Sequence, residues 1–272
     1  MKHNLQHKLA AISITTLCFL SISICSTAYA LGEKTDSLIA QSSSSTKQND
    51  LPRRVIVPKI KQNITIDGVL DEKAWSKAAT LAPFSYNDGS GMGRESTKVL
   101  IGYNDESLYL AWICKDSDIL ATYRNRDDKL WEEEVAEFFI TPDKLTKYFE
   151  LQWNPLGTIF DAIIHNTLKE NGLSKGIKGD WDWTAKGMEA AVKVDGTVQN
   201  SKDADKQWLV EVKIPFKSLE CSAPKSGDVW RANFYRYSRT TGQEEAVYYS
   251  WSPTKLQSFH EPSRFGYLQF GQ

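Results

Sequence analysis

The stretch YFELQWN, Tyr148 to Asn154, decides the fold class because apolar and polar side chains alternate along it without a break. On a β-strand, successive side chains point to opposite faces of the sheet. One face of such a strand would carry Phe149, Leu151 and Trp153, and the other would carry Tyr148, Glu150, Gln152 and Asn154. The pattern predicts an antiparallel sheet with one dry face and one face toward water.

The preceding apolar run, Val135 to Ile140, is interrupted by one carboxylate, Glu137. A buried carboxylate is costly unless it is hydrogen-bonded or points into a wet groove. The connection between the two runs, TPDKLTK, is short enough for a hairpin, and side chains opposite each other in a hairpin share a face. We therefore expect Glu137 to join the polar row Glu150, Gln152 and Asn154.

Short apolar or alternating runs, separated by turn residues, continue along the chain. The further predicted strands are Thr97 to Tyr103, Ser107 to Cys114, Thr158 to Ile164, Met188 to Val194, Gln207 to Ile214, Val229 to Tyr237, Ala246 to Trp251 and Gly266 to Phe270. One short helix is predicted over Glu72 to Ala79, with Asp71 as its cap. Many short strands are typical of an antiparallel β-sandwich, so the predicted class is all-β with one or two short helices.

Residues 1–30 are typical of a secretory signal peptide. A basic start precedes the apolar and hydroxyl-rich stretch Leu9 to Cys25, and Ala28-Tyr29-Ala30 has the A-x-A form of a cleavage site. The alternatives are a lipoprotein anchor at Cys25 and retention of the segment as a membrane anchor. Cleavage after Ala30 predicts a secreted, periplasmic or cell-envelope protein whose mature chain has no transmembrane segment.

The rest of the chain divides into a linker and a domain. Residues 31–53 are polar and Ser-rich, which predicts a disordered linker, and residues 54–272 would form the sandwich. Removal of residues 1–30 lowers Lys plus Arg from 33 to 31 against 34 Asp plus Glu. No basic patch for nucleic acid stands out in this slightly acidic chain. Cys114 and Cys221 remain, either as a disulfide, which export compartments permit, or as two thiols.

Trp131 and Glu137 together suggest a sugar site. A Trp at the rim of a polar groove offers a flat apolar face to the C–H side of a pyranose ring. A carboxylate can accept hydrogen bonds from two neighbouring sugar hydroxyls. The structural alternative is that Trp131 covers an edge of the sandwich and that Glu137 pairs with Arg124 or Arg126.

Several sequence blocks occur in order between residues 60 and 272: ITIDGVLDEKAWSKA, KVLIGYNDESLYLAWICKDSD, LWEEEVAEFFITP, YFELQWNPLGTIFD, WLVEVKIPFKSL and RFGYLQFG. This series resembles the domains of carbohydrate-binding module family 9, which are relatives of the DOMON-like sandwiches. The resemblance implies an antiparallel sandwich, found in secreted glycan-degrading systems, that binds sugars without cleaving them. It also implies two Trp that sandwich a terminal sugar, polar side chains that assist them, and calcium sites that support the fold.

Carried over by position, the resemblance assigns Trp131 as the first stacking Trp and Glu137 as its acid. Gln152 stands where binding members have an Arg, and Trp251 precedes the closing RFGYLQFG without the Asn that accompanies the second Trp of the family. Trp181 or Trp183 in the GDWDW loop is the alternative second stacking surface, or both pin that loop to the sandwich. The predicted ligand-binding residues are Trp131, Glu137, Glu150, Gln152, Asn154 and Trp251.

Acidic turns supply candidate calcium ligands. Asp105, Asp116 and Asp118 offer hard oxygen atoms that suit a structural Ca²⁺, although they lack an EF-hand spacing and also suit solvated turns. No other cofactor is expected. The expected partners are a carbohydrate ligand and glycan-degrading enzymes, with no nucleic acid.

Two other functions compete with a binding module. Some DOMON-like sandwiches hold haem through Met and His or Lys, and the candidate ligands here are Met92, Met188, His165 and His260. A glycoside hydrolase accessory domain with activity would need a pair of acids such as Glu137 with Glu150 or Asp161.

Overall fold

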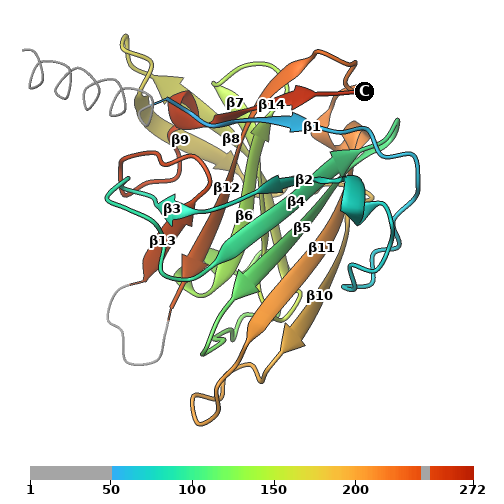
Figure 1. Cartoon of the computed structure of the whole chain (residues 1–272). Helices are drawn as coiled ribbons and strands as arrows, with labels where there is room; N and C mark the ends of the chain where they lie inside the picture. Colours follow the sequence, from blue (N-terminus) through green and yellow to red (C-terminus); the bar gives the residue numbers. More distant parts are fainter. Residues whose placement is uncertain (1–50, 240–245) are drawn as a thin grey trace, which may run out of the picture. The chain divides into compact units, whose positions relative to one another are not determined.

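Two β-sheets make up the described part of the chain, residues 51–239 and 246–272 of a computed structural model (Figure 1). These residues belong to one unit, Leu51–Gln272. The predicted signal peptide and residues 31–50 of the predicted linker lie outside the described residues. Within residues 51–239 and 246–272, no helix has the length and apolar character needed to cross a membrane.

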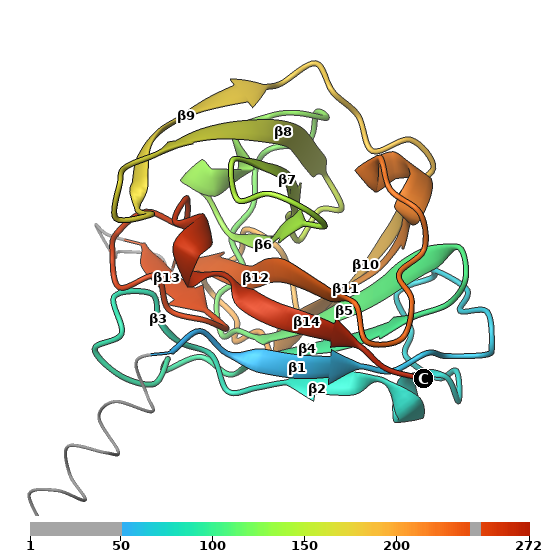
Figure 2. The ribbon, with the colours of Figure 1, turned by 90° about the horizontal axis from the view of Figure 1, so that it is seen from above.

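The larger sheet joins nine strands, with the order β1-β14-β12-β6-β7-β8-β9 and with β13 between β12 and β3. Its strands are β1 (Arg54–Val57), β3 (Ser85–Tyr86), β6 (Val135–Thr141), β7 (Lys147–Trp153), β8 (Ile159–Leu168), β9 (Ser174–Asp180), β12 (Val229–Ser238), β13 (Val247–Ser250) and β14 (Gly266–Phe270). All pairings are antiparallel except that of β1 with β14. Figure 2 shows the sheet curving from β12 through β6 and β7 to β8 and β9.

The smaller sheet joins five strands in the order β10-β11-β5-β4-β2. Its strands are β2 (Ala79–Leu81), β4 (Thr97–Tyr103), β5 (Ser107–Lys115), β10 (Glu189–Asp195) and β11 (Gln207–Pro215). The helical segments of the described residues are short 3₁₀ turns: η1 (Trp75–Lys77), η2 (Leu130–Glu132), η3 (Phe216–Leu219) and η4 (Pro262–Arg264). The predicted all-β sandwich is therefore confirmed.

The predicted helix over Glu72 to Ala79 shortens to the single turn η1. Ala79 already pairs with Ile101 as the first residue of β2, so the backbone cannot continue a helix there. Trp75 is held by a 2.9 Å hydrogen bond from its indole Nε1 to Glu211 Oε1. The predicted cap is wrong, because Ala74 is at the N-cap position and no side chain caps the turn. The neighbouring strand limits the length of the turn.

The main core lies between the two sheets. Phe149, Leu151 and Trp153 of β7 are buried in it, as the alternation predicts. Trp153 packs against Trp112 of β5, with ring centroids 5.4 Å apart, so a strand of the large sheet contacts a strand of the small one. Burial of such large apolar side chains stabilises the fold by about 1.5–3 kcal/mol for each Val, Leu, Ile, Phe or Met.

The opposite face of the larger sheet is also covered, which corrects the prediction of a wet face. Tyr148 and Glu150 of β7 are buried. Phe259 stacks on Tyr235 of β12 at 4.1 Å between ring centroids, and Phe265 packs on Tyr148 at 5.3 Å. The alternation predicts which side chains share a face, but the segment that covers this face comes from a distant part of the sequence.

Two further local predictions have clear outcomes. The Gly- and Lys-rich segment predicted as a loop contains β9, which pairs along β8 at the edge of the larger sheet. Exposed Lys residues are typical of edge strands because they hinder pairing with another chain. The open question on the cysteines is answered: Cys114 is a buried free thiol and Cys221 a half-buried free thiol.

Candidate functional site

Two carboxylates and one amide share the covered face of the larger sheet. β6 and β7 form the predicted hairpin, with Glu137 directly opposite Gln152. Glu150 lies in the adjacent row, opposite Phe139. In the first row, Glu137 is also opposite Tyr235 of β12. Because opposite residues of paired strands point to the same side, these polar groups lie beside one another.

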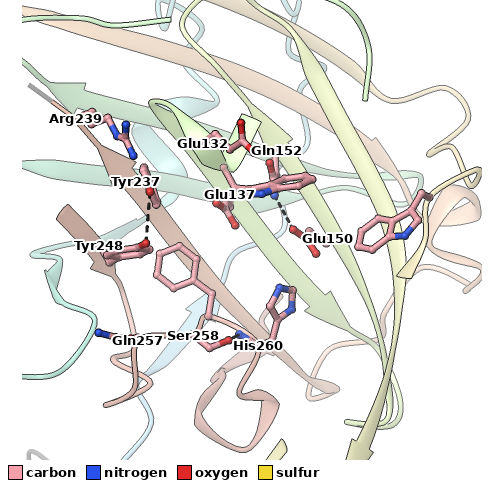
Figure 3. Close-up of a pocket in the computed structure, with 13 residues that line it drawn as sticks. Glu132, Glu137, Glu150, Gln152, Tyr237, Arg239, Tyr248, Gln257, Ser258 and His260 are labelled. Atoms are coloured by element: carbon pink, nitrogen blue, oxygen red, sulfur yellow. Dashed lines mark hydrogen bonds between the residues drawn. The ribbon is translucent and has the colours of Figure 1, made fainter. Parts of the chain in front are cut away.

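A cavity of about 520 Å³ opens above these polar groups. Figure 3 shows Glu137, Gln152 and Glu150 on neighbouring strands of this cavity, with Tyr237 and Tyr248 at its other side. The aromatic residues that line it are Trp131, Trp181, Tyr237, Tyr248 and Phe259. The size falls in the range of small-molecule sites, about 300–1,000 Å³.

The polar floor of the cavity has more hydrogen-bond acceptors than donors when its two acids are ionised. Gln152 Nε2 donates to Glu150 Oε1 at 2.6 Å. Glu150 Oε2 and Gln152 Oε1 are buried and have no hydrogen-bond partner. The residues that the structure describes offer no hydrogen bond or ion pair to Glu137. The alternative of an ion pair between Glu137 and Arg124 or Arg126 is therefore wrong, and Arg126 pairs with Asp161.

Burial of the two carboxyl groups changes their acidity. Glu137 is 2% and Glu150 4% exposed. Loss of water raises the pKa of Glu150 to about 8, against the effect of the hydrogen bond from Gln152, which lowers it. Loss of water, and then repulsion by Glu150, raise the pKa of Glu137 well above its usual range. Without a bound cation or donor, Glu150 therefore tends to hold its proton near neutral pH, and the pKa of Glu137 is shifted in the same direction.

Two Trp residues stand at the rim of the cavity on either side of one phenylalanine. Trp131 contacts Phe160 edge-on at 5.1 Å between ring centroids, and Trp181 contacts the same ring at 5.8 Å. Their exposed fractions are 37% and 50%. The GDWDW loop thus supplies a second Trp beside Trp131, which was one of the alternatives open from the sequence.

Trp251 and Asn154 do not line the cavity. Trp251 is buried in the main core against Phe234, and it lies so close to Gly266 that a Cβ there would be 2.2 Å from the indole ring. Asn154 Oδ1 accepts from the backbone N–H groups of Leu156 and Thr158, which closes the turn after β7. These positions argue for packing and turn formation, and against ligand contact.

Several residues that line the cavity are not among the ligand-binding residues predicted from the sequence. Tyr237, Tyr248, Arg239 and the segment Gln257 to His260 line the cavity. Tyr148 Oη and His260 Nδ1 lie 2.8 Å apart in a hydrogen bond, and burial lowers the pKa of His260 to about 4. The alternation of Tyr235 and Tyr237 on β12 was the available signal for the sheet side of the cavity. The segment Gln257 to His260, which covers this face, has no alternation of apolar and polar side chains that could have predicted it.

Comparison with known families identifies the domain. The family model described as carbohydrate-binding family 9 matches residues 92–270, more than half of the chain. The chain belongs to carbohydrate-binding family 9. The resemblance inferred from the ordered sequence blocks is therefore confirmed, and a carbohydrate-binding module is the supported class for this family 9 domain.

Solved structures share the fold of this family 9 domain. A putative carbohydrate-binding protein from Bacteroides uniformis ATCC 8492 is 17% identical, with a TM-score of 0.61, over 80% of this chain and 99% of that chain. A family 9 module from Caldicellulosiruptor kristjanssonii with cellotriose is 14% identical, with a TM-score of 0.54, over 80% and 94%. The same module with glucose is 14% identical, with a TM-score of 0.55, over 81% of this chain and 97% of that chain. A comparison with curated proteins gives no match.

The predicted calcium ligands of this family 9 domain do not form one site. Asp105 pairs with Lys59 at 2.5 Å, and Asp116 pairs with Arg236 at 2.5 Å. Residues 51–239 and 246–272 contain no group of three or more Asp, Glu, His or Cys side chains that could hold a metal ion. Asp105 and Asp116 each pair with a basic side chain, and the calcium that the family resemblance implies stays an expectation.

The candidate haem ligands are also spread over the family 9 domain. Met92 and His165 are exposed, Met188 packs against the main core, and His260 lies in the cavity. A haem needs an axial ligand at its iron and an apolar pocket around it. The described cavity holds His260, the two buried carboxyl groups and no Met, which does not fit that requirement.

Proposed function

We propose that this domain binds a pyranose unit of a glycan in the cavity above β6 and β7. The observation that carries the proposal is the combination, in one cavity, of exposed Trp faces with buried acceptors that lack partners. A pyranose has an apolar C–H face and an edge of hydroxyl donors. Trp131 and Trp181 suit the face, and Glu137, Glu150 and Gln152 suit the edge.

Membership of carbohydrate-binding family 9 supports this ligand class. The family 9 module of similar fold has been solved with glucose and with cellotriose, which favours a glucose-type unit as the first probe. The predicted signal peptide and linker add a wider proposal, that the domain is exported and acts beside glycan-degrading enzymes. N-terminal sequencing of the exported protein, with Leu31 as the expected first residue, tests the export step.

Calorimetric titration with glucose and cellotriose tests the site. Trp131→Ala should weaken binding by roughly 0.5–1.5 kcal/mol beyond the contribution of buried area. The exposed acid Glu170, in the β8–β9 turn away from the cavity, gives a control: Glu170→Gln should bind like the unchanged protein. Equal binding by Trp131→Ala, or no binding of any sugar in a wider glycan screen, would contradict the proposal.

The acidic pair raises the question of glycoside hydrolysis. Hydrolysis needs two carboxyl groups with different roles, one protonated and one ionised, and environments that separate their pKa values. Burial raises the pKa of both Glu137 and Glu150, so the two environments shift the acids in the same direction and do not separate their roles. Binding is therefore the better-supported function, and release of reducing sugar that is lost in Glu137→Gln would overturn this choice.

A further inference from the structure

The acceptors on the cavity floor narrow the ligand class further. The unsatisfied atoms there are Glu150 Oε2 and Gln152 Oε1, to which Glu137 adds a carboxylate without a described partner. When both acids are ionised, the Gln152 amide nitrogen is the donor among these three side chains, and one of its two N–H groups already donates to Glu150. With the two acids ionised, acceptors outnumber donors on this floor, so a ligand that brings several donors suits it.

Other buried carboxylates of the domain are supplied with donors. Glu211 accepts from the backbone N–H groups of Asp67 and Gly68 and from Trp75. Asp205 accepts from the N–H groups of Ile119 and Thr197. These two acids thus receive at least two donors each, whereas Glu150 accepts from Gln152 and Glu137 has no described donor.

Nearby cations do not compensate the pair. Arg239 lines the cavity but forms no ion pair with Glu137 or Glu150. Figure 3 shows its side chain next to Tyr237, apart from Glu150. His260 also lines the cavity, and its pKa is lowered to about 4 by burial, so its ring is neutral at pH 7. The floor therefore has room for a positive charge from the ligand.

We propose that the cavity selects an amino sugar, a pyranose whose free amine is protonated, with the ammonium group held by Glu137, Glu150 and Gln152. An ammonium has three donors and no acceptor, whereas a hydroxyl brings one donor and two lone pairs. The aromatic residues Trp131, Trp181 and Tyr248 add ring faces that attract a cation as well as the sugar C–H face. This inference rests on the proposed function, since it specifies the sugar bound at the same site.

The test compares sugars that differ only at carbon 2. Glucosamine, glucose and N-acetylglucosamine carry an ammonium, a hydroxyl and a neutral acetamide there, and calorimetry on the full domain gives their affinities. We expect glucosamine to bind roughly ten- to a hundredfold more tightly than glucose, the range for a hydrogen bond to a charged group. In Glu137→Gln and in Glu150→Gln this preference should fall toward unity, while Glu170→Gln should retain it.

Proton release gives a second readout. The titratable or charged groups that face the pair among the described residues are Glu132, Tyr148, Tyr235, Tyr237, Arg239, Tyr248 and His260. A bound ammonium favours ionised carboxylates, so the proton held by Glu150, whose pKa is about 8, should leave when glucosamine binds at pH 7. Titrations in buffers of different ionisation enthalpy should show this release for glucosamine and not for glucose.

Four other results of these titrations would contradict the preference for an amino sugar. Glucose that binds as tightly as glucosamine would overturn the amine preference and leave the proposed glycan site intact. N-acetylglucosamine that binds as tightly would assign the floor to an amide. Binding of Ca²⁺ alone that Glu137→Gln abolishes would assign it to a metal ion. A glycan screen without any binding would overturn both the inference and the proposed function.

Discussion

Two buried acidic clusters lie on opposite faces of the larger sheet and differ in how their charge is balanced. On the core side, Arg236 donates to Asp116 and Glu134 and pairs with Glu95 at 3.3 Å. On the cavity side, Glu137 and Glu150 have no cation among the described residues. The first cluster ties the two sheets together, because Arg236 lies on β12 and also donates to the backbone oxygen of Lys115 in β5.

The pKa shifts in the Arg236 cluster show how its charges balance one another. Burial lowers the pKa of the Arg236 guanidinium, but the surrounding anions, Glu134 among them, outweigh this and raise it. Burial raises the pKa of Glu134, and Arg236 opposes that shift. The structural acids described above receive a cation or several N–H donors. Glu137 lies beside a cavity with neither, so a ligand is its natural partner.

Removal of the structural cation should have the largest effect. Arg236→Met leaves Asp116 and Glu134 buried without their counterion, which typically costs about 3–5 kcal/mol in the free energy of unfolding. Urea denaturation measures this loss, and the exposed Arg94 provides the control Arg94→Met, which should change stability little. A loss for Arg236→Met no larger than that of the control would remove the distinction between the clusters.

Neutralisation of one acid in each cluster should separate stability from binding. Glu134→Gln should lower the free energy of unfolding because it breaks the ion pair with Arg236. Glu137→Gln should weaken ligand binding by roughly 1.5–3 kcal/mol, the range for hydrogen bonds to charged groups, without loss of stability. Thermal denaturation and calorimetry on both variants check this, and a destabilised Glu137→Gln with unchanged binding would make the cavity acid structural.

The pH dependence of stability should carry the signature of the unpaired acid. The pKa of Glu150 rises from 4.5 to about 8 on folding, so its stabilising effect is complete below about pH 4.5 and is lost as the pH rises through 8. The free energy of unfolding of the unliganded protein should fall over this window. In Glu150→Gln the fall should be smaller by up to a few kcal/mol, since one unit of pKa shift corresponds to about 1.4 kcal/mol. Urea denaturation at pH 5 to 8 measures it, and an equal fall in the free energy of unfolding of both proteins would contradict this prediction.

The smallest expected effect concerns the rim of the cavity. Trp181→Ala should weaken sugar binding by roughly 0.5–1.5 kcal/mol and leave stability nearly unchanged, because half of its surface is exposed. Its neighbour Trp183 packs on Phe149 at 5.1 Å between ring centroids and does not line the cavity. Trp183→Ala should therefore lower stability and not affinity, and the reverse result would exchange their roles.

The sequence by itself determined the fold class and most of the strands of this protein. The period-two alternation of Tyr148 to Asn154 fixes which side chains enter the core, because opposite faces of a strand are a local property of the backbone. The interruption at Glu137 likewise pointed to the cavity, since an acid in an apolar run needs a partner. Strands β4 and β14 have the predicted bounds, Thr97–Tyr103 and Gly266–Phe270.

Only the tertiary structure decided what covers the second face and which Trp residues reach the cavity. Trp251 ends a predicted strand and Trp181 lies in a predicted loop, and both were candidates for the second stacking surface. Trp251 packs against Phe234 in the core, whereas Trp181 stands half exposed beside Phe160. Local patterns cannot separate them, because the neighbours that bury or expose a side chain come from distant strands. For the same reason, the sequence predicted an acid in need of a partner, and the fold showed that its own residues leave Glu137 without one.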